Sequence, residues 1–219
     1  MRVVCNIKRT LALLTLTMAV ASPFYAQQSP ITFEGICKNL AKHPYIRGDF
    51  ELNQYLHITK KSINSSGKFT LSSNDGIIWF AEKPIKTVSA VTKKFFIQEI
   101  NGHLKKFDGE KIPVFTDVAN VISAMFTGDF ETLEKNFIID YTAEAEGKTI
   151  IWRATLTPKD KTISKFLKAV EVGGTSTAAN STVEVFNIIQ LNGDRSDYLL
   201  INQVLTDNLS EDECKYFEK

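Results

Sequence analysis

Residues that usually bind metals or carry out catalysis are few in this 219-residue chain, and they do not form a known motif. The three histidines lie too far apart for the paired spacing of a zinc site, and no two cysteines form a C-x-x-C pair. The sequence also lacks the G-x-S-x-G nucleophile motif and the glycine-rich loops that bind nucleotides. We therefore expect no metal, no cofactor and no catalytic residue; the histidines are His43, His57 and His103.

The acidic residues are the remaining candidates for chemistry, and their grouping favours exposed surface. Glu211-Asp212-Glu213 and the pair Glu144 and Glu146 lie in polar stretches, where carboxylates are normally solvated. The stretch 194–197 (DRSD) lacks the further oxygen ligands of a calcium loop and fits a hairpin tip. One alternative stays open, because a hydrolase with two dispersed carboxylates is not recognisable among 25 acidic residues.

The N-terminal segment has the composition of a secretory signal peptide. Basic residues precede an apolar run at 10–21, which is followed by a proline-containing stretch ending at Ala26. This run is too short to cross a bilayer core of about 30 Å as a helix. A buried N-terminal helix is the alternative interpretation. We predict cleavage after Ala26, or alternatively after Ala21, so that 1–26 is the signal peptide and 27–219 is a single domain, soluble in the periplasm.

Composition argues against one class of partner and favours another. Lys and Arg number 26 and Asp and Glu 25, so the chain has no basic excess and we expect no nucleic-acid partner. The 15 phenylalanines are more than a core of this size obviously needs. A curled sheet lined by Phe and Met side chains can hold a flexible apolar ligand. Ordinary core packing is the alternative for each phenylalanine taken singly.

The cysteines agree with export. Cys5 precedes the apolar run and would be removed with the signal peptide, and no cysteine follows the cleavage site to carry a lipid anchor. Cys37 and Cys214 remain, near opposite ends of the mature chain. In an oxidising compartment we expect them to form a disulfide. Two unpaired buried thiols are the alternative.

The pattern of apolar residues predicts a mainly β protein with inserted helices. Apolar spacing of three and four residues predicts helices at 31–43 and 113–126, with 130–136 as an extension of the second. Alternating stretches predict eight to eleven strands, including a long one from Ile46 and a hairpin turn at Asn101-Gly102. Consecutive strands joined by short turns favour one antiparallel sheet, closed or half closed, with a helical cover.

Two stretches carry a resemblance to a known family. Residues 65–71 (SSGKFTL), with Gly76-Ile77-Ile78-Trp79 and Pro84 after them, resemble LolA-type periplasmic lipoprotein carriers, as does 47–50 (RGDF). The resemblance implies a half-open β-barrel with a helical lid around an apolar cavity that shields acyl chains, without catalysis. It implies a lipoprotein or lipid cargo, an inner-membrane donor complex and an outer-membrane acceptor. Leu52 replaces the family's usual Gln, which leaves both a lipoprotein and another lipid open as cargo.

The expected cavity combines side chains from the sheet and from the helix at 113–126. This helix also places Val114 and Val118 near the cavity. Trp79 must point to the face opposite Ile78 in a regular strand, so two placements stay open: packing under the helices or at the rim, and contact with the cargo. We expect a monomeric carrier; a periplasmic scaffold protein without lipid cargo is the alternative. The residues expected to line the cavity are Phe50, Phe69, Leu71, Ile78, Phe80, Ile122 and Met125.

Overall fold

The computed structural model describes residues 31–92, 94–108 and 113–217, with residues 113–118 described by their backbone alone. The predicted signal peptide lies outside these residues. The described residues form four α-helices: α1 (Phe33–Leu40), α2 (Pro113–Thr127), α3 (Phe130–Asn136) and α4 (Glu211–Phe217). A short 3₁₀ turn follows β8 at Ile163–Lys165. The strands are β1 (Tyr45–Leu56), β2 (Lys61–Ser72), β3 (Gly76–Lys83), β4 (Thr87–Thr92), β5 (Phe95–Ile100), β6 (His103–Asp108), β7 (Phe137–Glu146), β8 (Thr149–Pro158), β9 (Leu167–Ser176), β10 (Val185–Gln190) and β11 (Arg195–Thr206).

All eleven strands belong to one antiparallel sheet that curls but does not close. The order is β6-β5-β4-β3-β2-β1-β11-β10-β9-β8-β7. Each pairing therefore joins two strands that are consecutive in the chain, except the pairing of β1 with β11. The edge strands β6 and β7 follow each other in sequence, and α2 and α3 are inserted between them. The predicted fold class, a mainly β half-open antiparallel sheet with inserted helices, is therefore confirmed.

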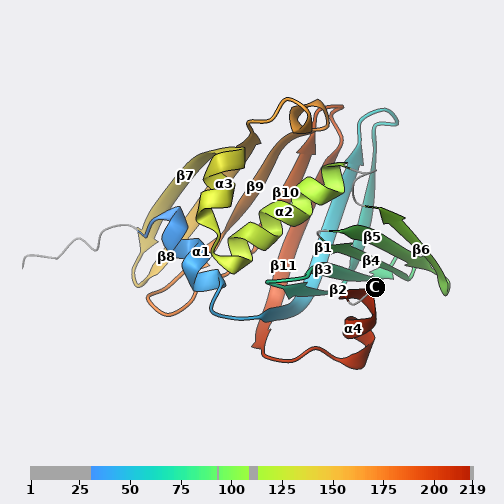
Figure 1. The fold of residues 1–219 in the computed structure, drawn as a ribbon, viewed down its shortest axis with the longest axis horizontal. Helices are drawn as coiled ribbons and strands as arrows, with labels where there is room; N and C mark the ends of the chain where they lie inside the picture. The colour runs from blue at the N-terminus through green and yellow to red at the C-terminus, as the bar shows by residue number, and fades with distance from the viewer. Residues whose placement is uncertain (1–30, 93, 109–112, 218–219) are drawn as a thin grey trace, which may run out of the picture.

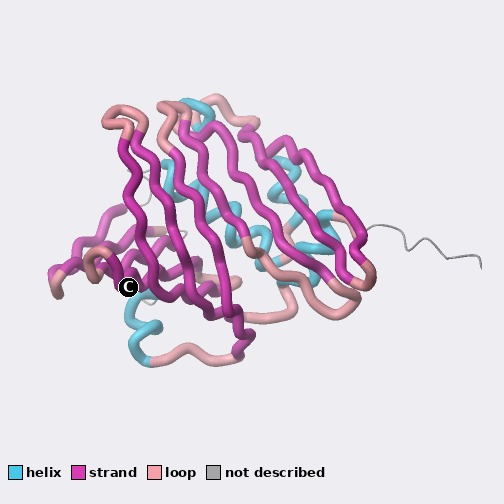
Figure 2. Tube along the Cα trace, turned by 180° about the vertical axis from the view of Figure 1, so that it is seen from behind, coloured by secondary structure: helices cyan, strands magenta, loops and turns pink. Residues whose placement is uncertain are grey.

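Three helices cover one face of this sheet. In Figure 1, α1, α2 and α3 lie in front of the strands, and α2 crosses the curl of the sheet diagonally. Figure 2 shows the opposite side, where the strands face the viewer and these helices lie behind them. We call the face under α1, α2 and α3 the inner face, and the opposite one the outer face. The main hydrophobic core lies between the inner face and these helices.

Local sequence explains the placement of the covering helices. The apolar residues of α1 recur at three- and four-residue spacing, and all are buried, including Ile36 and Leu40. Thr32 caps this helix, because its hydroxyl accepts a hydrogen bond from the Gly35 amide. Gly128, with φ of +72°, separates α2 from α3 in a conformation that favours glycine, and Asp129 then caps α3.

The last helix was not expected from the sequence. The chain does not end with the hairpin of β10 and β11, because α4 follows it and packs on the outer face against β3 and β4. Glu213, expected at a solvated surface, is only 5% exposed. Ser210 and Glu213 form a capping box: the Glu213 carboxylate accepts from the Ser210 amide at 2.6 Å, while the Ser210 hydroxyl accepts from the Glu213 amide.

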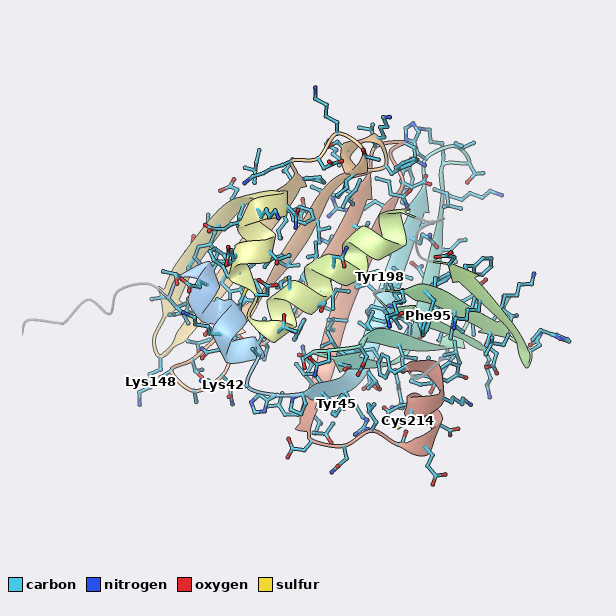
Figure 3. All side chains as sticks on the ribbon, in the orientation of Figure 1. Lys42, Tyr45, Phe95, Lys148, Tyr198 and Cys214 are labelled. Atoms are coloured by element: carbon cyan, nitrogen blue, oxygen red, sulfur yellow. The ribbon has the colours of Figure 1, made fainter. Side chains whose placement is uncertain are left out.

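The predicted disulfide is not formed. Cys37 and Cys214 are both free thiols, the first buried in α1 and the second half-buried in α4. The two helices cover opposite faces of the sheet, and Figures 1 and 3 show α1 well separated from α4 and its labelled Cys214. A disulfide needs Cα atoms within roughly 7 Å of each other, which this arrangement does not provide.

No helix among the described residues is long and apolar enough to cross a bilayer.

Candidate ligand cavity

A cavity of about 250 Å³ lies on the inner face next to α2. Its walls come from β1 to β5 on one side and from β10 and β11 on the other, and Ile122 of α2 closes part of it. These strands meet because β1 pairs with β11 in the middle of the sheet. The sixteen lining residues are Phe50, Leu52, Gln54, Ser65, Ile77, Trp79, Ala81, Thr87, Ser89, Val91, Phe96, Gln98, Ile122, Phe186, Ile188 and Tyr198.

One end of the cavity is apolar and buried. Ile77, Val91 and Phe96 form a continuous row across three strands, since Ile77 pairs with Val91 and Val91 with Phe96. All three are buried. Burial of apolar surface at this end stabilises any apolar group that enters, at about 25 cal/mol per Å². This end can therefore hold a hydrocarbon group.

Aromatic rings form the centre of the cavity. The Trp79 ring stacks on Tyr198 with their centroids 4.4 Å apart, and Phe50 meets Trp79 edge to face at 5.0 Å. In Figure 3, Tyr198 lies on the inner face beside α2. Burial raises the pKa of Tyr198 to about 12, so its phenol stays neutral. These contacts fix the rings in place and leave the cavity beside them.

The other end of the cavity is polar and half exposed. Along β1 the inner-facing residues change from Phe50 to Leu52 to Gln54, and along β4 from Val91 to Ser89 to Thr87. Because β1 and β4 run in opposite directions, both changes point toward the same end of the sheet. We call this end, with Gln54, Ser65, Thr87, Ser89 and Gln98, the mouth.

None of the lining side chains carries a formal charge. A metal site has no basis here either, because no cluster of three or more His, Cys, Asp or Glu residues occurs in the described part of the chain. Nothing in this lining supplies a nucleophile paired with a base or an acid–base pair. The arrangement can bind and shield a ligand.

The structure brings only some of the expected residues to this cavity. Phe50 and Ile122 line it. Phe69, Leu71 and Met125 are buried in the adjoining inner core but are not part of the lining.

Ile78 and Phe80 point to the outer face, where they pack with the cluster that contains Tyr216 of α4. The reason is the alternation of β3, which places Ile77 and Trp79 inside and their neighbours Ile78 and Phe80 outside. The expectation that Trp79 faces away from Ile78 is confirmed. The side chains of Val114 and Val118 lie outside the described part of α2.

Several lining residues were missed by sequence reasoning. Leu52 and Gln54 follow Phe50 at two-residue spacing, so the alternation of β1 already placed them on the same face. Tyr198 and Phe186 enter the cavity only because β11 pairs with β1, a contact between segments that are far apart in sequence. No local signal in the sequence indicates that pairing.

No protein-family model matches the chain, and no curated protein matches it. Solved structures of similar shape include an outer membrane lipoprotein-sorting protein domain from Vibrio parahaemolyticus, with a TM-score of 0.46 and 7% identity over 84% of this chain and 95% of that one. A LolA superfamily protein from Nitrosomonas europaea gives 0.44 and 9%, over 86% and 98%. The lipoprotein LppX of Mycobacterium tuberculosis gives 0.42 and 6%, over 81% and 98%. These include members of the family that the sequence resembles, at a similarity too low to assign a function.

Proposed function

We propose that the protein is a carrier that shields an acyl chain of a lipid or lipoprotein in the inner-face cavity. The observation that carries this proposal is an unfilled cavity whose buried end is apolar and whose open end is polar. Transfer of each methylene from water into such a site is worth about 0.8 kcal/mol. A free acyl chain therefore crosses an aqueous compartment only rarely, and a shielding cavity removes this barrier.

The size of the cavity supports a proposed movement of α2 when a ligand enters. Its volume of about 250 Å³ is slightly below the roughly 300 to 1,000 Å³ of typical ligand sites. Ile122 closes the cavity from α2, so displacement of this helix enlarges it without breaking the sheet. We propose that α2 is the lid and that Phe50 and Ile122 contact the acyl chain, while Phe69, Leu71 and Met125 support them from the core.

A buried hydroxyl favours the opening of this lid. Ser123 of α2 is 2% exposed, and its Oγ has no hydrogen-bond partner in the described part of the chain. An unpaired buried polar group costs about 1 to 3 kcal/mol. Opening of α2 would hydrate this hydroxyl and offset part of the free energy of lid movement.

The cellular setting belongs to the same proposal. We propose that residues 1–26 direct export, that 27–219 form one domain, and that the mature protein works as a monomer in the periplasm. The resemblance of 47–50 and 65–84 to LolA-type carriers implies a donor complex at the inner membrane and an acceptor at the outer membrane. The proposed role does not depend on a disulfide, and Cys37 and Cys214 are free thiols.

Native mass spectrometry of protein purified from the periplasm tests the proposal, which expects co-purified lipid. In solution, an apolar fluorescent probe should bind one site per molecule and be displaced by an acylated peptide, but not by the same peptide without its acyl chain. Equal competition by both peptides would contradict the carrier and favour a scaffold that recognises polypeptide.

A matched pair of substitutions locates the site. Ala81 lines the cavity, and Ala81→Phe should fill it and lower probe affinity at least tenfold with little loss of stability. Val88 lies on the neighbouring strand but packs on the outer face. Val88→Phe should leave probe affinity unchanged; an equal loss of affinity in both variants would contradict the location.

A further inference from the structure

The polar side chains at the mouth of the cavity make no hydrogen bonds to other side chains or to the backbone of the described residues. The side chains of Gln54, Ser65, Thr87, Ser89 and Gln98 line the cavity, together with the hydroxyl of Tyr198. No side-chain hydrogen bond joins any of these six to another residue in the described part of the chain. Elsewhere in the sheet, half-buried polar groups such as Thr175 and Thr182 are hydrogen-bonded to each other. The mouth therefore presents donors and acceptors that are free for a ligand or for water.

These groups lie at a fixed distance from the apolar end. Phe50 and Gln54 are four residues apart on the same face of β1, which corresponds to about 13 Å along the strand. Val91 and Thr87 have the same separation on β4. A ligand that places its hydrocarbon chain beside Ile77 and Val91 thus brings its polar end to the mouth. The cavity accepts an amphipathic ligand in one orientation, with the acyl chain first.

The lining also determines which polar end is accepted. A carboxylate or phosphate at the mouth would meet no cation of the lining, because no Lys, Arg or His belongs to it, and Lys105, which pairs with Gln98 across β5 and β6, is exposed to solvent. Because the mouth is half exposed, such a charge would lose part of its hydration without gaining a partner in the lining, which is unfavourable, whereas an uncharged polar group loses little once it is hydrogen-bonded. The amides of Gln54 and Gln98 can donate to an ester carbonyl and accept from a hydroxyl.

We propose that the cavity selects acyl compounds whose polar end is an uncharged ester, amide or hydroxyl, such as a monoacylglycerol, and discriminates against free fatty acids and acyl phosphates. The selecting residues are Gln54, Ser65, Thr87 and Gln98 at the mouth. This inference rests on the proposed carrier function, since it names the class of ligand for the same cavity.

Displacement of the apolar probe at pH 8 by ligands of one chain length tests this selectivity. Monopalmitoylglycerol should displace the probe at a concentration at least tenfold lower than palmitate or lysophosphatidic acid, each used below its critical micelle concentration. Equal or tighter binding of palmitate or lysophosphatidic acid would overturn the selectivity and leave the carrier function intact. Failure of the probe and of all three ligands to bind would overturn the carrier function itself.

Two neighbouring serines on β2 provide a matched charge test. Ser65 lines the cavity, and Ser66 is likewise half-buried but follows it on the strand and so points to the other face. Ser65→Lys should place a cation at the mouth and raise the affinity for palmitate relative to monopalmitoylglycerol by at least tenfold. Ser66→Lys adds the same net charge and should leave the ratio unchanged. An unchanged ratio in a folded Ser65→Lys protein, or the same shift in both variants, would overturn the assignment of the mouth.

Discussion

The two faces of β3 carry similar apolar residues but are used differently. On the outer face, Ile78 and Phe80 are packed against Tyr216 of α4, and Phe80 also borders a pocket beside Glu213. On the inner face, Ile77 and Trp79 border a cavity that the protein leaves unfilled. One strand therefore contributes to stability with one row of side chains and to a binding site with the other.

The polar groups on the two faces differ in the same way. On the outer side, the carboxylate of Glu213 receives hydrogen bonds from Arg47, Thr70 and Ser210. Tyr216 donates to Glu99 at 2.9 Å. Among the described residues, the six polar groups of the cavity have no such partners. A packed cluster with satisfied polar groups specifies a fixed structure, whereas a cavity with free polar groups can accept a ligand.

The largest expected difference between the two sides concerns the cysteines. Cys37 belongs to α1 on the inner side, where burial raises its pKa from 9.0 to about 12. Its thiolate fraction is then about a thousandfold below that of an ordinary thiol at the same pH. Native alkylation at pH 8, followed by mass spectrometry, should modify Cys214 first and Cys37 at least a hundredfold more slowly. Unfolding without reductant should make both reactive; resistance of both in the unfolded protein would mean that they form a disulfide after all.

The adjacent isoleucines of β3 test the comparison with one type of substitution. Ile78 is fully buried in the outer cluster, so Ile78→Ala should lower the free energy of unfolding by about 3 kcal/mol through the void it creates, without changing probe affinity. Ile77 already borders the cavity, and Ile77→Ala should cost about half as much because fewer packing contacts are lost.

Urea denaturation measures the stability of both isoleucine variants. Ile77→Ala should also change probe affinity, because it enlarges the cavity. If Ile78→Ala alone changed probe affinity, the outer face would be the binding face, and the comparison would be reversed.

The outer side should also be the side that responds to acid. Burial raises the pKa of Glu213, but the hydrogen bonds from Arg47, Thr70 and Ser210 outweigh it and lower the pKa from 4.5 to about 2. The folded state therefore favours the carboxylate. Its stabilising contribution, about 3 kcal/mol by linkage, is present above about pH 4.5 and is lost as the pH falls toward 2.

Urea denaturation across this pH range tests the acid response. Glu213→Gln should be less stable than the unmodified protein at neutral pH, and this difference should shrink toward pH 2. The exposed Glu211 of the same helix is the control, and Glu211→Gln should change stability by less than about 0.5 kcal/mol. A constant difference between Glu213→Gln and the unmodified protein at every pH would contradict the linkage.

Alternation and helical spacing were enough to predict most of the fold, because these signals are local. The Asn101-Gly102 hairpin is confirmed, and both residues have the positive φ that this turn requires. The helix α4 was missed, although Ser210-x-x-Glu213 is a readable capping box. Its short polar sequence gives no sign of burial, although Tyr216 and Glu213 are buried in the structure.

The cavity was harder to predict because it depends on which strands meet. Phe50 was expected from its own strand, but the stacking of Tyr198 on Trp79 requires β1 to lie between β2 and β11. The assignment of Phe80 failed for a different reason: an apolar residue on a strand can be buried on either face when a helix covers each. Sequence alternation separates the two faces of β3 but does not say which one borders the cavity under α2.

The smallest effect is expected at Ser123, whose buried hydroxyl on the inner side has no hydrogen-bond partner among the described residues. Ser123→Ala removes this polar atom and should raise the free energy of unfolding by about 1 kcal/mol. Because the same change stabilises the closed position of α2, it should slow probe association about fivefold, as measured by stopped-flow fluorescence. Ser72 is the matched control, since its buried hydroxyl is hydrogen-bonded to Asp75 at 2.7 Å and Ser72→Ala should be destabilising. A stabilised Ser123→Ala protein that takes up the probe at the unmodified rate would mean that α2 is a fixed wall of the cavity, and that the ligand enters through the mouth alone.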